Sequence, residues 1–130
     1  DYYGYDDGLY AAVRLLSILQ KSGDSLAGFR DALPPVVNTP EIRVPCPDDR
    51  KWAVVEEVRA RQLALGKETS AVDGVRVQEA GGWWLLRASN TQDILVVRCE
   101  AQSPHDLEAI TECVRRELAA AQILLPASSG

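Results

Sequence analysis

The sequence lacks methionine altogether, and histidine and phenylalanine each occur once in its 130 residues. A chain without methionine has no initiator residue, so we expect it to be part of a longer protein. It has one histidine, His105, and three cysteines, Cys46, Cys99 and Cys113, which form no C-x-x-C pair. Such a set predicts neither a zinc site nor a disulfide framework. We therefore expect reduced cysteines and a cytoplasmic protein.

Long hydrophobic runs and an excess of basic residues are also missing. No apolar stretch reaches the roughly 20 residues that cross a membrane, and no signal peptide is visible, so we expect no membrane partner. The net charge of −5 argues against nucleic acid as a partner, because general nucleic-acid binding needs a basic face. A small anionic ligand is still possible, since a local arginine can be attractive on an acidic protein. With 46% hydrophobic and 25% charged residues, the composition is typical of a folded domain.

The first third of the sequence predicts two helices. Apolar residues at helical spacing over 9–19 indicate a helix that begins after Asp6 or Asp7 and ends near Lys21. A second, short helix over 25–33 is followed by two prolines, which cannot continue it. The first helix is apolar enough to need a packing partner, so we expect it to belong to a preceding domain.

The rest of the sequence predicts a cluster of strands between helices. In order, we expect strand 41–46, helix 50–65, a weak strand 69–72, strand 75–78, strands 83–88 and 94–101, and helix 104–121. Asp73-Gly74 is a strong signal for a two-residue hairpin turn. Asp48 or Asp49 is expected to cap the helix over 50–65. The buried face of that helix is expected to consist of Val54, Val55, Val58 and Leu65, with Gln62 among them.

Strands that follow one another closely in the chain pair antiparallel, and the flanking helices can cover one face of the resulting sheet. We therefore predict an α+β fold with an antiparallel sheet of about four to five strands and helices packed on one face. The expected organisation is a terminal helix of the preceding domain over 1–23, a linker or hinge over 24–40, a C-terminal domain over 41–125 and a tail over 126–130.

One loop carries a group of side chains with an evident chemistry. Arg87, Ser89, Asn90 and Thr91 place a guanidinium, two hydroxyls and a carboxamide within five positions between two apolar strands. Arginine offers a planar fork that fits phosphate bidentately, and the other side chains add neutral donors. The backbone amides of the turn can join them as a nest. From these residues alone, a phosphate site and a plain polar hairpin loop are equally open.

The other polar candidates have simpler explanations. Arg76 and Arg98 could lie near the loop, but alternating strands commonly direct such side chains to solvent. His105 stands at a helix start without a nucleophilic or acidic partner, which makes it a weak catalytic candidate. The acidic pairs before the first and third helices could bind a divalent cation, yet helix capping explains both pairs without a metal.

Four segments together resemble the C-terminal domain of the α-D-phosphohexomutases, in particular the bacterial phosphomannomutase/phosphoglucomutase branch. They are DGVRV at 73–77, GW at 82–83, LRASNT at 86–91 and LVVRCEA at 95–101. Residues 5–16 resemble the last helix of the domain before it, and TPE at 39–41 also matches. The R-x-S-N-T loop in its strand context is the most specific of these pieces. The resemblance implies a TATA-box-binding-protein-like fold for the C-terminal domain.

The resemblance also implies a function. The family's enzymes are isomerases that interconvert hexose 1-phosphate and hexose 6-phosphate through a bisphosphorylated intermediate. In that setting Arg87, Ser89, Asn90 and Thr91 would bind the substrate phosphate that is not reacting. The family's phosphoserine loop, magnesium-binding loop and sugar-reading loop are absent from this sequence. We therefore expect Mg²⁺ to be held by the remaining domains of the parent enzyme, which would be the partners of this chain, and the chain alone to be inactive.

The sequence departs from the family pattern after the loop. Gln92-Asp93 stands where many relatives have a proline at the second position, and this change could loosen the loop or bring a carboxylate near the phosphate. Two other interpretations remain open. The chain could be a free-standing regulatory α+β module that binds a small anion, or a purely structural interaction domain. The apolar first helix argues against a free-standing module, because it lacks a packing partner.

Overall fold

A computed structural model describes Gly4 and residues 6–126 of the chain. It divides into two units, Asp1–Pro35 and Val36–Gly130, which are described separately below. Most of the tail expected over 126–130 lies outside the described residues. Among the residues described, no helix is long and apolar enough to cross a membrane.

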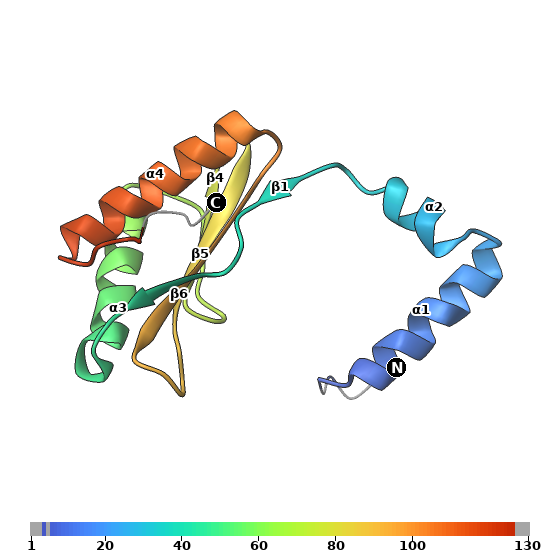
Figure 1. Cartoon of the computed structure of the whole chain (residues 1–130), viewed down its shortest axis with the longest axis horizontal. Helices are drawn as coiled ribbons and strands as arrows, with labels where there is room; N and C mark the ends of the chain where they lie inside the picture. The colour runs from blue at the N-terminus through green and yellow to red at the C-terminus, as the bar shows by residue number, and fades with distance from the viewer. Residues whose placement is uncertain (1–3, 5, 127–130) are drawn as a thin grey trace. The chain divides into compact units, whose positions relative to one another are not determined.

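The first unit consists of two helices, α1 (Gly8–Ser22) and α2 (Leu26–Asp31), shown in blue in Figure 1. Asp7 caps α1 by accepting a hydrogen bond of 2.9 Å from the backbone amide of Tyr10, as the sequence predicted. Gly23 ends α1 at φ +75°, in the left-handed region that glycine favours. No residue of α1 is buried, and its apolar stripe is exposed: Leu9 77%, Val13 56% and Leu16 66%.

The second unit is built on a six-stranded antiparallel sheet. Its strands are β1 (Val37–Asn38), β2 (Ile42–Pro45), β3 (Thr69–Ser70), β4 (Val75–Glu79), β5 (Gly82–Ala88) and β6 (Ile94–Ala101). The strand order is β1-β6-β5-β4-β3, and β2 pairs with β6 on the same edge as β1. Six strands thus fill five positions, which confirms the predicted antiparallel sheet.

Two strand details differ from the sequence prediction. β1 lies inside the segment 24–40 that was expected to be a linker, and it pairs with residues 100–101 of β6. The Asp73-Gly74 turn is not a two-residue hairpin, because β3 ends at Ser70, which pairs with Arg76, and residues 71–74 form a longer loop before β4. This longer loop brings Gly74, at φ +78°, against the backbone of β5.

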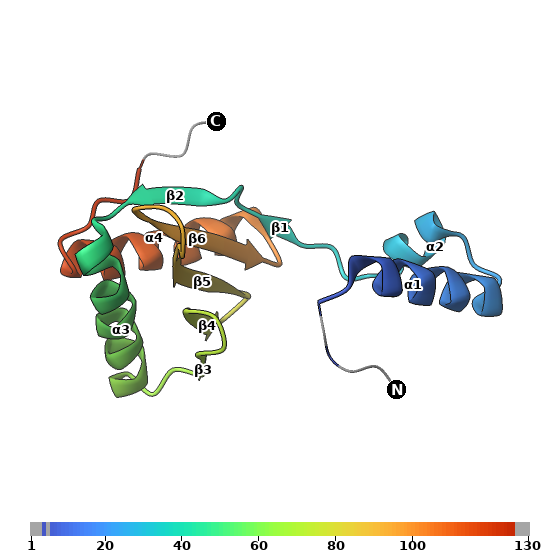
Figure 2. The ribbon, with the colours of Figure 1, turned by 90° about the horizontal axis from the view of Figure 1, so that it is seen from below.

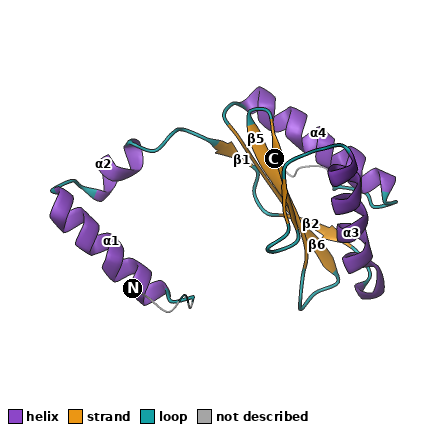
Figure 3. Ribbon diagram, turned by 180° about the vertical axis from the view of Figure 1, so that it is seen from behind, coloured by secondary structure: helices purple, strands orange, loops and turns teal. Residues whose placement is uncertain are grey.

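Two helices, α3 (Asp48–Ala64) and α4 (Pro104–Ala120), cover the same face of the sheet, as Figures 2 and 3 show. This confirms the one-sided α+β arrangement. The core lies between them and the sheet, with fully buried Trp84 as its largest side chain. Helix α4 faces this core through Ile110, Val114 and Leu118. Full burial of each such side chain contributes roughly 1.5–3 kcal/mol, so these contacts hold α4 on the sheet.

Helix α3 differs from the prediction at both ends. It begins at Asp48, so the acidic pair occupies its first turn and makes no side-chain cap. Their charge still favours a helix start, because the helix dipole is positive there. Leu65 follows the last helical turn and is 67% exposed, so its expected place in the core was wrong. Lys51 is instead buried on that face, one turn before Val54 and Val55.

The opposite face of the sheet carries arginines. Arg76 and Arg98 both lie there, since each pairs with Leu85 across the ladder. The Arg76 guanidinium stacks 4.7 Å from the ring centroid of Trp83, and Arg98 pairs with Glu41 at 3.2 Å. The sequence had favoured a solvent-facing position for both, and Arg98 is exposed while Arg76 is half-buried. Helices α3 and α4 leave this face open, as the edge-on view in Figure 2 shows.

Candidate functional site

The candidate site is the β5–β6 loop, which we define as residues 89–93, together with Arg87 at the end of β5. The last ladder pair is Ala88 with Leu95. One more bond, from the Ser89 amide to the Ile94 carbonyl at 3.0 Å, closes the loop at its base. Ala88 points to the core, so the neighbouring Arg87 points to the open face, as strand alternation requires.

The structure places all four sequence-predicted site residues at this hairpin end. Asn90 and Thr91 are exposed, Ser89 is half-buried, and the Arg87 side chain keeps 39% of its surface exposed. Their proximity follows from adjacency in the chain, which is why the sequence alone could group them. Solvent can reach these donors, so the site can accept a ligand without rearrangement of the core.

Ser89 organises the inside of the loop. Its Oγ accepts hydrogen bonds from the backbone amides of Thr91 at 3.4 Å and Gln92 at 3.2 Å. This arrangement is a serine turn, in which a side chain replaces a backbone acceptor. Two amides that could have joined an anion-binding nest are therefore already used. The bonds occupy lone pairs of Oγ, and no described residue accepts the hydroxyl proton, which is available to a ligand.

Arg87 contacts the carboxylate of Asp73. Its Nη1 lies 3.5 Å from Oδ2 of Asp73, at the outer limit of a hydrogen bond, and the Asp73 side chain is 70% exposed. A contact this long and this exposed is weak. The guanidinium is therefore held near the loop while its remaining donors stay available for an anion.

Gly74 explains why Asp73 lies beside Arg87. An added Cβ at this glycine would stand 2.7 Å from Arg87 Cβ and 2.8 Å from Arg87 Cα. Only a residue without a side chain can approach β5 so closely at a positive φ. The sequence predicts a turn at Asp73-Gly74, but it does not reveal this contact with Arg87. The sequence shows only that Asp73-Gly74 precedes the loop by two strands.

The far end of the loop is anchored to β2 and α3. The Asp93 carbonyl accepts a hydrogen bond of 3.0 Å from the Cys46 amide. The Gln92 carbonyl accepts from the Ile94 amide at 2.9 Å and from Lys51 Nζ at 3.0 Å. The Gln92 side chain also accepts from Arg43 Nη1 at 3.2 Å. The two residues that depart from the family pattern therefore carry these anchoring contacts.

A network of charges on the open face lies next to this anchor. Glu41 accepts hydrogen bonds from Arg98 at 3.2 Å and from Arg43 at 3.1 Å. The hydrogen bond from Arg98, followed by that from Arg43, lowers the pKa of Glu41 below its ordinary value. Glu41 therefore stays ionised at neutral pH, and it neutralises part of the positive charge that borders the loop.

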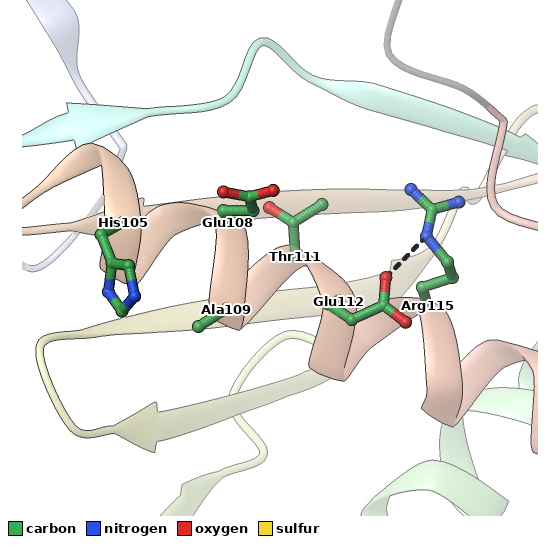
Figure 4. A pocket seen from close by; sticks show the side chains of 6 residues that line it. All are labelled: His105, Glu108, Ala109, Thr111, Glu112 and Arg115. Carbon is green, nitrogen blue, oxygen red and sulfur yellow. Dashed lines mark hydrogen bonds and ion pairs between the residues drawn. The ribbon is translucent and has the colours of Figure 1, made fainter.

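Further hollows of the described surface lie away from this loop, and a small one of about 130 Å³ is lined by donors of Asn38, Thr39 and Arg98. One broad depression of about 570 Å³ lies over α4, and its six lining side chains all come from that helix (Figure 4). Its His105 is 92% exposed, and its Glu112 is paired with Arg115 at 3.1 Å. None of its lining residues belongs to the β5–β6 loop. No three histidine, cysteine, aspartate or glutamate side chains gather as a metal site within the described residues.

Comparison with known protein families gives one match over most of the second unit. Residues 41–117 match the model described as phosphoglucomutase/phosphomannomutase, C-terminal domain. This range contains β2 to β6, helix α3, helix α4 as far as Glu117 and the whole candidate site.

Curated relatives and solved structures agree with this match. A phosphomannomutase/phosphoglucomutase of Pseudomonas putida is 41% identical over 118 residues, which cover 90% of this chain and 25% of the relative. A phosphoglucomutase of Neisseria gonorrhoeae is 41% identical over 84% of this chain and 24% of its own length. A crystal structure of a phosphoglucomutase/phosphomannomutase family protein from Burkholderia thailandensis has a TM-score of 0.75 and 37% identity, over 97% of this chain and 27% of that one. The chain thus spans about a quarter of the length of these relatives.

Proposed function

Because the chain belongs to the phosphoglucomutase/phosphomannomutase family, through its C-terminal domain, we propose that the β5–β6 loop anchors the phosphate of a hexose phosphate. Arg87 would supply the charge, and Ser89, Asn90 and Thr91 would supply neutral donors. The observation that carries the proposal is the hairpin end itself. There the guanidinium of Arg87 is held only by a 3.5 Å contact, beside exposed polar side chains.

The proposed role is to position the substrate and neutralise its charge. Phosphoryl transfer depends largely on positioning and electrostatic stabilisation, and a substrate phosphate that does not react is a good anchor. In a parent protein that interconverts hexose 1-phosphate and hexose 6-phosphate through a bisphosphate, the loop would bind whichever phosphate is distant from the reacting centre. The loop contains no nucleophile or base placed for the transfer, so we assign it binding and not catalysis.

The chemistry would then come from the rest of the parent protein. A magnesium ion, which supplies charge stabilisation in such reactions, would be bound outside this chain, because the described residues gather no metal-ligand group. We accordingly expect the 130-residue chain alone to show no mutase turnover. Appearance of glucose 6-phosphate from glucose 1-phosphate with the purified chain would contradict this. We place the parent protein in the cytoplasm, where phosphorylated hexoses are formed and used.

We also propose that residues 1–23 are the last helix of the preceding domain and that 24–40 contain the hinge. The exposed stripe of α1 supports this assignment, because Leu9, Val13 and Leu16 are not covered by the described residues of their own unit. A helix with one apolar face gains most of its stability from packing, so α1 requires a partner. Motion about the hinge would open and close the phosphate anchor over the rest of the active site.

The test is a titration of the ¹⁵N-labelled chain with glucose 1-phosphate, followed by NMR. We expect amide shifts concentrated on residues 87–93, and we expect Arg87→Ala to abolish them. Arg115→Ala is a matched control, because its side chain is 41% exposed and also pairs with one carboxylate. Shifts that survive in Arg87→Ala, or that vanish equally in Arg115→Ala, would overturn the assignment.

The same titration separates the two remaining interpretations. A free-standing anion sensor would respond to inorganic phosphate as strongly as to the sugar phosphate, because it needs only the charged group. A structural interaction domain would show no shift with either compound while the loop stays folded.

A further inference from the structure

Lys51 is a buried cation whose contacts lead to the candidate site. It lies in the first turns of α3 and is 1% exposed, although lysine is rarely buried without partners. Its Nζ pairs with Asp48 at 2.5 Å, one turn earlier in the same helix. Its second partner is the Gln92 carbonyl at 3.0 Å, 41 residues away in the chain.

The backbone of Gln92 anchors the end of the β5–β6 loop. The Gln92 amide donates to Ser89 Oγ at 3.2 Å, and its carbonyl accepts from Lys51 and from the Ile94 amide. Both backbone polar groups of Gln92 are thus fixed, the amide by the serine turn and the carbonyl by the ammonium of Lys51. Hydrogen bonds to a charged donor are about twice as strong as neutral ones. The serine turn connects this anchor directly to the proposed phosphate-binding residues.

We propose that Lys51 is a positioning residue, whose buried ammonium fixes the β5–β6 loop in the conformation that receives a phosphate. This inference rests on the proposed function of the loop, and it adds a residue from another element to that site. The loop contains no proline to restrict its backbone, so an external anchor has to supply its order. Order before binding lowers the entropic cost of binding, so loss of the anchor should weaken affinity.

A purely structural role would affect the whole second unit and not the loop in particular. Lys67 provides the comparison, because it also pairs with one carboxylate, Glu79, and its side chain is 36% exposed. Its contacts lie at the opposite end of α3, beside β4, and none of them reaches the loop. Loss of Lys67 should therefore lower stability without a specific effect on residues 89–93.

The experiment uses the ¹⁵N-labelled 130-residue chain with Lys51→Met, Lys51→Arg and the control Lys67→Met. Methionine keeps most of the side-chain length and removes the charge, whereas arginine keeps the charge. Two signals are measured by NMR. The first, without ligand, is hydrogen exchange at the Ile94 and Cys46 amides, which bond to the loop carbonyls, relative to amides in the middle of β5. The second is the dissociation constant for glucose 1-phosphate.

We expect Lys51→Met to speed exchange at the two loop-contacting amides about tenfold, to leave β5 unchanged and to weaken binding at least fivefold. Lys51→Arg should restore most of both signals, and Lys67→Met should change neither. If Lys51→Met does not fold, Lys51→Gln, a shorter polar replacement, is read in the same way. Unchanged exchange and affinity, or a uniform rise of exchange throughout the unit, would overturn the role of Lys51. Absence of binding by the unmutated chain would overturn the proposed function instead, while the exchange measurement still tests Lys51.

Discussion

Replacing Asp73 by asparagine should strengthen phosphate binding at the β5–β6 loop. Asp73 is the carboxylate that contacts Arg87, so it would compete with a bound phosphate for that guanidinium and would also repel a dianion. Asparagine is similar in shape and equally suited to a turn, so the change removes the charge and leaves the loop geometry in place. The close contact of Gly74 with β5, which holds the turn beside Arg87, is also preserved.

The magnitude follows from the distance and the exposure. Unit charges 3.5 Å apart interact by about 1.2 kcal/mol in water, and exposed pairs are typically worth about 0.2–1 kcal/mol. The side chains of Arg87 and Asp73 are 39% and 70% exposed, so we use the range for exposed pairs, about 0.2–1 kcal/mol. Since about 1.4 kcal/mol corresponds to a tenfold change in affinity, we expect a gain of about 1.4- to fivefold at low salt.

The assay is the dissociation constant for glucose 1-phosphate at low salt and at about 1 M salt, where charges are screened beyond about 3 Å. The gain should shrink at high salt. Asp31→Asn is the matched control, because Asp31 is also an exposed carboxylate paired with an arginine and its loss changes the net charge equally. An equal gain in Asp31→Asn would show a general charge effect. A gain that persists when Arg87 is also replaced by alanine would refute competition for that guanidinium.

Two further predictions concern stability. Gly74→Ala should lower the free energy of unfolding by more than Gly66→Ala does. Both glycines have positive φ, at +78° and +70°. Of the two, only Gly74 would bring its new Cβ into collision with β5. Denaturant unfolding checks this, and equal losses of about 1 kcal/mol would contradict the contact. Burial raises the pKa of the Cys99 thiol from 9.0 to about 11 in the folded state. The folded state therefore keeps the thiol proton at pH values where the unfolded state loses it. Stability should therefore fall by roughly 3 kcal/mol as pH rises from about 9 to 11. Cys99→Ala should flatten this part of the pH profile, and an unchanged slope would contradict the assignment.

Local patterns were sufficient for the elements that are long or sharply bounded. Helix α1 begins at a capping aspartate and ends at a glycine, and both signals lie within the segment itself. Strands β5 and β6 were predicted to within one residue, because apolar strand residues on both sides bound a short polar stretch. The four candidate phosphate ligands lie within five consecutive residues, so the sequence could group them without knowledge of the fold.

Partners distant in the chain could not be found in this way. β1 is two residues long and exists as a strand because β6 offers it an edge, which the sequence of the supposed linker does not reveal. The register of β3 with β4 leaves a loop in which Gly74 lies against β5, and the local preference for a tight hairpin does not predict it. Leu65 was expected in the core by its spacing, but the helix ends before it.

The sequence by itself determined the α+β class, the hairpin and the set of donors at its end, because each depends on neighbours in the chain. Tertiary structure alone decided which residues control those donors. Asp73 reaches Arg87 across 14 residues, and Lys51 reaches Gln92 across 41. Burial of Lys51 is opposed by the desolvation of its charge, so no hydrophobic pattern predicts it. It is stable only where the fold supplies a carboxylate and a carbonyl within about 3 Å of its ammonium.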